Sequence, residues 1–82
     1  MIKDIERVIT NFVSKELLDI ETLIDPEESF ENLSLGSIEI MEIIFFIEKE
    51  FKLKLDAEVF REGRLRSVRS LGEFVLGKWK EP

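Results

Sequence analysis

Apolar residues recur every three or four positions near the start of the chain, a spacing typical of an amphipathic helix. The positions that share this face are Ile2, Ile5, Ile9, Phe12 and Val13. Charged residues such as Lys3 and Asp4 fill the other side, and no glycine or proline interrupts the pattern. The pattern predicts a first helix over about residues 2–18.

The helical period is lost between Asp19 and Gly36. Asp25-Pro26 is a turn signal, because the residue before proline is kept out of the helical region. Connections of this length in a small domain are usually functional or disordered. Apolar residues recur within it, at Leu23, Ile24, Phe30, Leu33 and Leu35. They favour an ordered loop that packs back on the core.

The most apolar stretch of the chain begins at Ser37 and continues to Phe51. Apolar side chains occupy much of its circumference, as is typical of a central helix. Its acids are Glu39, Glu42, Glu48 and Glu50. Glu39 lies in the first turn, where a negative charge interacts favourably with the helix dipole. We therefore expect a second helix over residues 37–51.

Two further helices are expected in the last third of the chain. A weak pattern predicts a short helix over residues 57–62, which ends near Gly63, a common terminating residue. Apolar positions return at helical spacing at Leu71, Phe74, Val75 and Trp79. They predict a last helix over residues 70–79, with Ser67 or Ser70 as its cap. The expected fold is therefore all-α, with three main helices, one short helix and a long loop after the first.

The length and composition narrow the possible functions. The 82 residues are sufficient for a single domain, 1–82, with a modest core. Cysteine and histidine are absent, which excludes disulfide scaffolds, thiol catalysts and zinc–thiolate sites and removes the commonest general base. We therefore do not expect an enzyme or a metal site. The longest apolar run is the five residues 43–47, and no signal peptide is evident, so we expect no membrane insertion and a cytoplasmic location.

The charge is divided unevenly along the chain. Residues 1–51 hold 13 acids and 4 bases, a net charge of −9, whereas residues 52–82 hold 5 acids and 8 bases, a net charge of +3. The overall charge of −6 argues against a nucleic-acid-binding protein, which needs a basic face. An acidic half of this kind is suited to a basic partner surface.

Four arginines lie close together in the basic half, at Arg61, Arg64, Arg66 and Arg69. A solvated face or internal pairing with the acidic half explains them most simply. A site for phosphate or nucleic acid is a further alternative, although neither stacking aromatics nor a glycine-rich loop lies nearby. A partner with an acidic patch is the more useful hypothesis, with Arg61, Arg64 and Arg66 as its contacts.

Ser37 is the first candidate for a modification site. It follows Gly36 at the end of the long loop and opens the central helix. A phosphate ester on its hydroxyl would lie among unpaired backbone N–H groups at the positive end of the helix dipole. The simpler alternative is that Ser37 only caps the helix.

The stretch from Phe30 to Phe51 resembles the acyl carrier protein family. In that family a leucine stands four residues before the serine that carries 4′-phosphopantetheine. A hydrophobic residue follows the serine, an acid lies five residues on, and an acid-rich stretch ends with phenylalanine fourteen residues on. The matching residues here are Leu33, Ser37, Ile38, Glu42, the stretch 48–50 and Phe51. Residues 67–75 also resemble the signature of the family's last helix, and the likeness covers about residues 2–76.

The resemblance implies an acyl-carrier-protein-like bundle with 4′-phosphopantetheine attached covalently to Ser37. A phosphopantetheinyl transferase would move the group from coenzyme A, and its thiol would hold an acyl or aminoacyl intermediate as a thioester. The partners implied are a loading enzyme and downstream synthases, in fatty acid-like, polyketide or other specialised biosynthesis. The protein would be a non-catalytic monomer. The resemblance also implies that Glu39, Glu42 and Glu48 face basic patches on partner enzymes.

Three positions depart from the family pattern. Gly36 stands where the family usually has aspartate, and Ser34 where it has glycine. Phe46 replaces an alanine beside the space that houses the acyl chain, and with Phe45 it could fill that space, although ordinary core packing is the simpler explanation. The departures leave open an alternative function, a carrier-like interaction module without phosphopantetheine. They also leave the cargo and the pathway undetermined.

Overall fold

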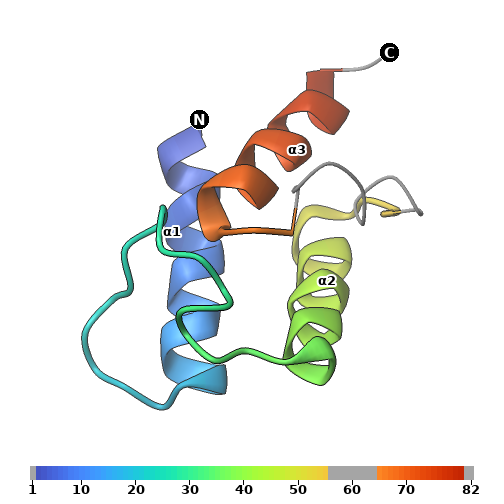
Figure 1. Ribbon diagram of the computed structural model, residues 1–82. Coiled ribbons are helices and arrows are strands. Elements are labelled where there is room, and N and C mark those ends of the chain that lie inside the picture. The colour runs from blue at the N-terminus through green and yellow to red at the C-terminus, as the bar shows by residue number, and fades with distance from the viewer. Residues whose placement is uncertain (1, 56–64, 81–82) are drawn as a thin grey trace.

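The computed structural model describes residues 2–55 and 65–80 (Figure 1). These residues form three α-helices, α1 (Ile2–Phe12), α2 (Ser37–Phe51) and α3 (Val68–Lys80), and no strand beyond one isolated bridge. The expected all-α class is thus confirmed. None of the helices in the described residues is long and apolar enough to cross a membrane.

The helix expected over residues 57–62 lies outside the described residues, as do Arg61 and Arg64. The central helix has the expected bounds, because α2 begins at Ser37 and ends at Phe51. The long loop after the first helix is also present; in Figure 1 its first part runs on the side of α1 away from α2, and its second part crosses α1 to reach α2.

The first helix ends differently from the expectation. A π-helical turn, η1 (Val13–Leu17), continues α1, and the Leu18 N–H donates to the Val13 carbonyl at 2.9 Å. The turn places the buried Ser14 beside the returning loop, where its hydroxyl accepts a hydrogen bond from the Ile24 N–H at 3.1 Å. The contact ties the loop to the end of the first helix across ten residues of sequence.

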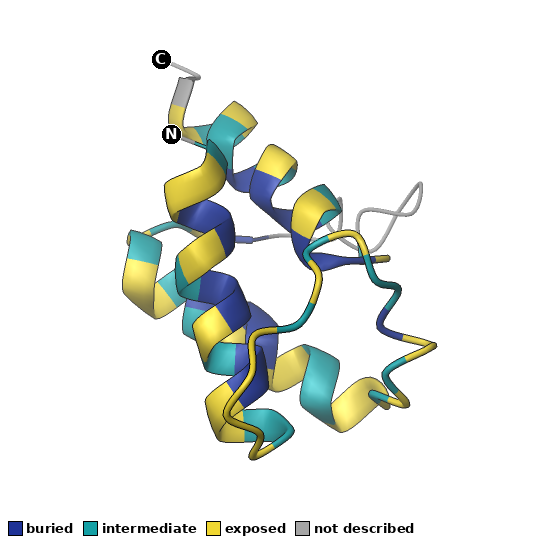
Figure 2. Ribbon diagram, turned by 90° about the vertical axis from the view of Figure 1, so that its left-hand side faces the viewer, coloured by how far each residue is buried: buried dark blue, intermediate teal, exposed yellow. Residues whose placement is uncertain are grey.

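The core lies where the three helices face one another. Figure 2 shows the buried residues on the inward faces of α1 and α3. The buried apolar side chains of the helices are Ile5, Ile9, Val13, Ile43, Ile44, Ile47, Val68, Leu71 and Val75. Removal of this apolar surface from water is the main favourable contribution to folding.

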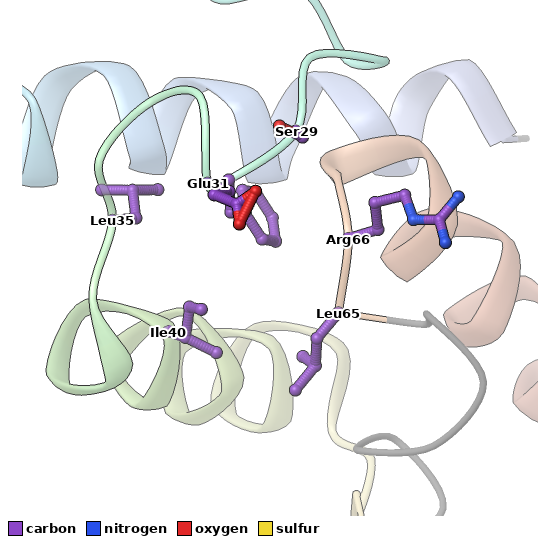
Figure 3. A pocket seen from close by; sticks show the side chains of 7 residues that line it. Ser29, Glu31, Leu35, Ile40, Leu65 and Arg66 are labelled. Atoms are coloured by element: carbon purple, nitrogen blue, oxygen red, sulfur yellow. The ribbon is translucent and has the colours of Figure 1, made fainter.

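The long loop adds side chains to this core, as expected. Phe30 is buried in the loop, and Leu35 and Leu65 approach Ile40 of α2 (Figure 3). Leu23 differs from the expectation, because its side chain is 52% exposed.

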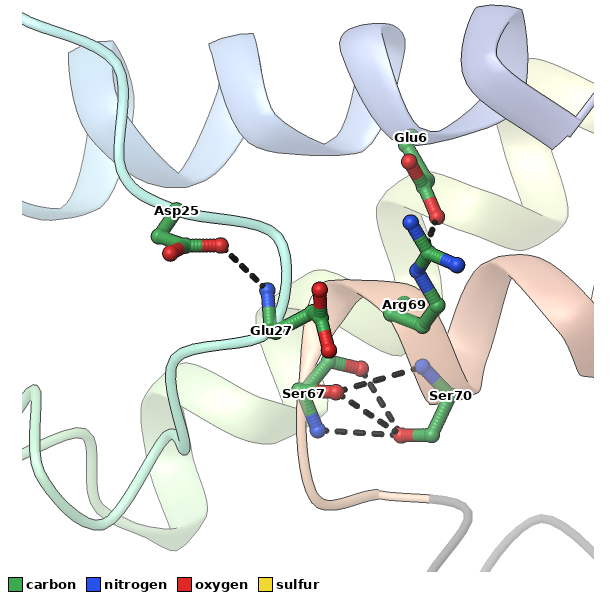
Figure 4. A network of polar contacts seen from close by, with 6 residues as sticks. All are labelled: Glu6, Asp25, Glu27, Ser67, Arg69 and Ser70. Atoms are coloured by element: carbon green, nitrogen blue, oxygen red, sulfur yellow. Dashed lines mark hydrogen bonds and ion pairs between the residues drawn. The ribbon is translucent and has the colours of Figure 1, made fainter.

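Two backbone hydrogen bonds join the loop to the start of α3. The Phe30 N–H donates to the Arg66 carbonyl, and the Arg69 N–H donates to the Pro26 carbonyl, each at 2.8 Å. Ser67 and Ser70 also cap the helix reciprocally, because each hydroxyl accepts a hydrogen bond from the other residue's N–H, at 3.2 and 3.0 Å (Figure 4). The cap at Ser67 explains why α3 begins two residues before the expected position 70.

The interface between α1 and α3 contains one buried charge. Glu6 is buried on α1, and its Oε2 lies 2.9 Å from Nε of Arg69 (Figure 4). Gly72 allows the close approach, since a Cβ there would lie 3.1 Å from Cδ1 of Ile2. The ion pair compensates a carboxylate whose burial would otherwise be costly.

Candidate functional site

Ser37 is the first residue of α2, and its side chain is exposed. The N-cap is Gly36, which has φ −91° and ψ −174°, an extended conformation open to any residue. Glycine has no side chain with which to cap the helix. The Gly36 N–H instead donates to Oε1 of Glu39 at 2.8 Å. The interpretation of Ser37 as a capping residue is therefore wrong.

The N-terminus of α2 is open around this serine. The first helical hydrogen bond runs from the Ile40 N–H to the Gly36 carbonyl at 3.0 Å, so the N–H groups of residues 37–39 precede the helical ladder. Within the described residues the Ser37 hydroxyl makes no hydrogen bond. An exposed hydroxyl next to unpaired N–H groups is suited to an anionic ester, which the helix dipole stabilises.

A tight turn holds the loop in place before Ser37. The Leu35 N–H donates to the carbonyl of the buried Phe30 at 3.0 Å, and Ser34 has φ 59°, in the left-handed region. Glycine enters this region without the steric cost that other residues meet. Ser34, which stands where the family pattern has glycine, thus adopts a backbone conformation that favours glycine.

An apolar stripe on α2 lies beside the serine and is uncovered. Its members are Ile38, Met41 and Phe45, which are 71%, 37% and 59% exposed. Residues at these spacings share one face of a helix. The sequence pattern predicted a central helix that is apolar on most sides, but it could not show that this face stays exposed.

The three acids expected at a partner surface differ in their surroundings. Glu39 holds the Gly36 N–H, and Oε2 of Glu48 accepts a hydrogen bond from the Leu55 N–H at 2.8 Å. Glu42 is exposed on α2 and makes no hydrogen bond or ion pair within the described residues. Two of the three acids thus have a role inside the fold that sequence spacing did not indicate.

Phe45 and Phe46, two neighbouring phenylalanines of α2, have different surroundings. Phe46 stacks on Phe12 of α1, with ring centroids 4.1 Å apart and ring planes 12° from parallel. Phe45 points to solvent, so the expectation that both rings fill the interior is wrong for Phe45. The contact of Phe46 lies between α1 and α2.

An open groove of about 550 Å³ lies near the start of α2. Its apolar lining is Phe30, Leu35, Ile40 and Leu65 (Figure 3). Leu35 and Ile40 lie two residues before and three residues after Ser37. Arg66, one of the expected partner contacts, borders this groove, where its guanidinium points away from the apolar lining, and it is not part of the acidic face of α2.

The helix order, the long pinned loop and the exposed serine at the start of α2 define a class, the helical carrier proteins. The family model for the phosphopantetheine attachment site matches residues 7–75, and the chain belongs to this family. A search of curated protein sequences gave no match. The fold is similar to a crystal structure of an acyl carrier protein from Thermotoga maritima, with a TM-score of 0.78 and 24% identity over 96% of this chain and 91% of that chain.

Proposed function

We propose that the protein carries an acyl or aminoacyl intermediate as a thioester on 4′-phosphopantetheine attached to Ser37. The single observation that carries the proposal is the exposed Ser37 hydroxyl, which makes no hydrogen bond to the described residues, at an open helix N-terminus. The phosphopantetheine-attachment family, to which the chain belongs, supports it.

In the attachment step one phosphorus–oxygen bond forms and one breaks. The Ser37 oxygen attacks the β-phosphorus of coenzyme A, the serine proton passes to a base of a transferase, and 3′,5′-adenosine bisphosphate leaves. The product is a phosphodiester with one negative charge. Open N–H groups of α2 favour that charge, whereas the nearby Glu39 carboxylate opposes it. No catalytic group of the carrier is needed, because the transferase and later partners supply the chemistry.

The apolar stripe Ile38, Met41 and Phe45 is the proposed partner surface, with Glu42 at its edge. An apolar helix face of this spacing fits a groove on a partner enzyme. The residues of α2 include four glutamates and one lysine, a net charge of −3, so the fitting groove has a basic rim. The charges raise the rate of encounter and select the partner more than they add affinity.

The cargo is proposed to rest in the open groove rather than in a closed interior. The groove begins beside the attachment point, at Leu35 and Ile40. The core residues Ile43 and Ile47 of α2 are fully buried, and Phe46 is stacked on Phe12. We therefore expect a long acyl chain to gain little shelter. Its attachment should raise the melting temperature by no more than a short acyl group does, and a large rise would contradict this part of the proposal.

The test is the intact mass of the protein after incubation with coenzyme A and a broad-specificity phosphopantetheinyl transferase. The wild-type chain should gain the mass of one phosphopantetheine group, and Ser37→Ala should gain none. Ser34→Gly is the matched control: it changes a neighbouring serine of the same turn, where φ is 59°, and it should be modified like the wild type. Circular dichroism spectra should show that both variants are folded.

The outcome of this test separates the two functions. Modification of Ser37→Ala would contradict the assigned site. No mass gain of the wild type with transferases of several specificities would contradict the carrier function and favour the unmodified interaction module.

A further inference from the structure

A second surface, on the loop side of α1, combines apolar and cationic side chains. A hollow of about 190 Å³ lies between α1 and the loop. Its lining residues are Lys3, Glu6, Arg7, Thr10, Leu23, Ile24 and Pro26. None of them belongs to α2, so this hollow is separate from the proposed partner surface.

The charge of the hollow is positive on a protein that is acidic overall. Lys3 and Arg7 lie four residues apart on one face of α1, and both are exposed and make no ion pair within the described residues. The charge of Glu6 is balanced by Arg69 at 2.9 Å, so among the lining side chains the charges of Lys3 and Arg7 are not compensated. Asp25, between the lining residues Ile24 and Pro26 in the sequence, accepts a hydrogen bond from the Glu27 N–H at 2.9 Å and keeps its negative charge, which opposes part of the attraction for an acidic segment.

The opposite wall of the hollow is apolar and exposed. Leu23 is 52% exposed there, beside Ile24 and Pro26, and Ile20 of the same loop is also exposed. The wall keeps its shape because the Ile24 N–H is bound by Ser14 and the Pro26 carbonyl by the Arg69 N–H. An exposed apolar wall that is fixed at both ends is available to another molecule without rearrangement of the loop.

We propose that this hollow is a second docking site, which binds an acidic segment of a partner protein. An apolar side chain of the segment would contact Leu23 and Ile24, and its carboxylates would face Lys3 and Arg7. An acidic occupant is proposed because Lys3 and Arg7 make no ion pair within the described residues. A protein segment is proposed rather than an inorganic anion because only a segment would also contact the apolar wall. The volume fits a single anchoring side chain better than a whole helix.

A second docking site would allow the protein to bind two different partners at the same time. The α2 surface is apolar with acids, and the hollow is apolar with cations, so one type of partner surface does not suit both. The two surfaces share no residue, which lets one partner hold the protein while an enzyme uses Ser37. The second site does not depend on phosphopantetheine, and its test uses the unmodified protein.

The test follows the backbone amide signals of the ¹⁵N-labelled protein by NMR during titration with a short synthetic peptide of glutamate and leucine. Signals of Arg7, Thr10, Leu23 and Ile24 should shift in a saturable way. The matching peptide of lysine and leucine should leave them unchanged. The double variant Lys3→Glu/Arg7→Glu should bind the acidic peptide at least about tenfold more weakly.

Two further variants control for charge and for the apolar wall. Lys49→Glu/Lys54→Glu has the same net charge as the first double variant but changes exposed residues elsewhere, and it should retain binding. Leu23→Ser should weaken binding of the peptide several-fold, because its exposed side chain forms the wall.

Several results would overturn the proposal. Absence of shifts at the hollow would show that the peptide does not bind there, and equal weakening in both double variants would show that only net charge acts. The same shifts with inorganic phosphate, unaffected by Leu23→Ser, would identify an anion site rather than a docking site. Concentration-dependent self-association that the acidic peptide reverses would identify a second copy of the chain as the occupant.

Discussion

The two ends of α2 are built in opposite ways. At the N-terminus, Gly36 provides no side-chain cap and Ser37 is exposed. At the C-terminus, the Leu53 N–H binds the Glu48 carbonyl at 3.2 Å and the Glu48 carboxylate binds the Leu55 N–H. Nε1 of Trp79 also donates to the Phe51 carbonyl at 3.3 Å. Two carbonyls of the last turn, those of Glu48 and Phe51, thus have partners, whereas the N–H groups of residues 37–39 have none within the described part of the chain.

The C-terminal end of α2 is held by contacts with the rest of the fold, whereas its N-terminal end carries the proposed modification site. Contacts that fix α2 relative to α3 gather at its C-terminal end, since Trp79 meets Phe51 edge to face with ring centroids 5.3 Å apart. The serine lies at the other end, some fourteen residues away in the sequence. A transferase can therefore engage Ser37 without competition from contacts that stabilise the fold.

The largest effect is expected from Trp79→Ala. The substitution removes the ring contact with Phe51 and the hydrogen bond to its carbonyl. Because Trp79 is 43% exposed, the loss of stability should be about 2 kcal/mol, below the range for a fully buried tryptophan. In a domain of this size that lowers the melting temperature by roughly 10 °C, which circular dichroism measures.

Trp79→Phe provides the control for this prediction. Phenylalanine keeps a ring near Phe51 but has no N–H donor, so it should lose less than half as much stability. Modification of Ser37 should proceed at the wild-type rate in both variants at temperatures where they are folded. A slower rate in a folded variant would contradict the independence of the two ends.

Glu48→Ala is expected to have the next largest effect. It leaves the partly buried Leu55 N–H without its acceptor, which should lower the free energy of unfolding by about 1–2 kcal/mol. Glu48→Gln retains an acceptor oxygen and should lose less. Urea denaturation of the two variants measures the difference. Unchanged stability of Glu48→Ala would show that the residue serves only partners, as expected from the sequence.

Substitutions at the open end should have the smallest effect on stability. Gly36→Ser adds a capping hydroxyl in an ordinary backbone conformation, and it should stabilise the protein by about 0.5 kcal/mol. In both variants the new Cβ would lie 3.1 Å from Oε1 of Glu39, but Gly36→Asp should gain less because it also brings a second carboxylate close to that of Glu39. Thermal unfolding of the three proteins measures this order.

Gly36→Asp should nevertheless be modified faster than the wild type by a generic fatty-acid-type transferase. The expectation rests on the aspartate that acyl carrier proteins usually have before the serine. Initial rates of mass gain compare the two proteins, with Gly36→Ser as the uncharged control. Equal rates for all three would show that the glycine does not limit recognition.

The sequence predicted those helix bounds that depend only on neighbouring residues. The bounds of α2 follow from the loop signals and the apolar run that starts after Gly36. The start of α3 required a choice between Ser67 and Ser70, and the structure uses both in one reciprocal cap. The carbonyl that binds the Arg69 N–H comes from Pro26, more than forty residues earlier, which a local pattern cannot indicate.

Features that depend on tertiary contacts could not be predicted from the sequence. The π-turn after Phe12 accompanies the contact of Ser14 with the returning loop. The internal partner of Glu48 comes from the segment after α2. The exposed Phe45 illustrates the same limit, since its apolar character predicts burial and only the arrangement of neighbouring helices leaves it uncovered.

The central claim is that the open end of α2 receives the phosphopantetheine group at Ser37. Proteolysis of the modified protein, followed by fragmentation mass spectrometry of its peptides, locates the group directly. The account predicts that the whole added mass is on Ser37, with none on Ser29 or Ser34 of the preceding turn. A phosphopantetheine group on either of those serines, or on any residue other than Ser37, would contradict it.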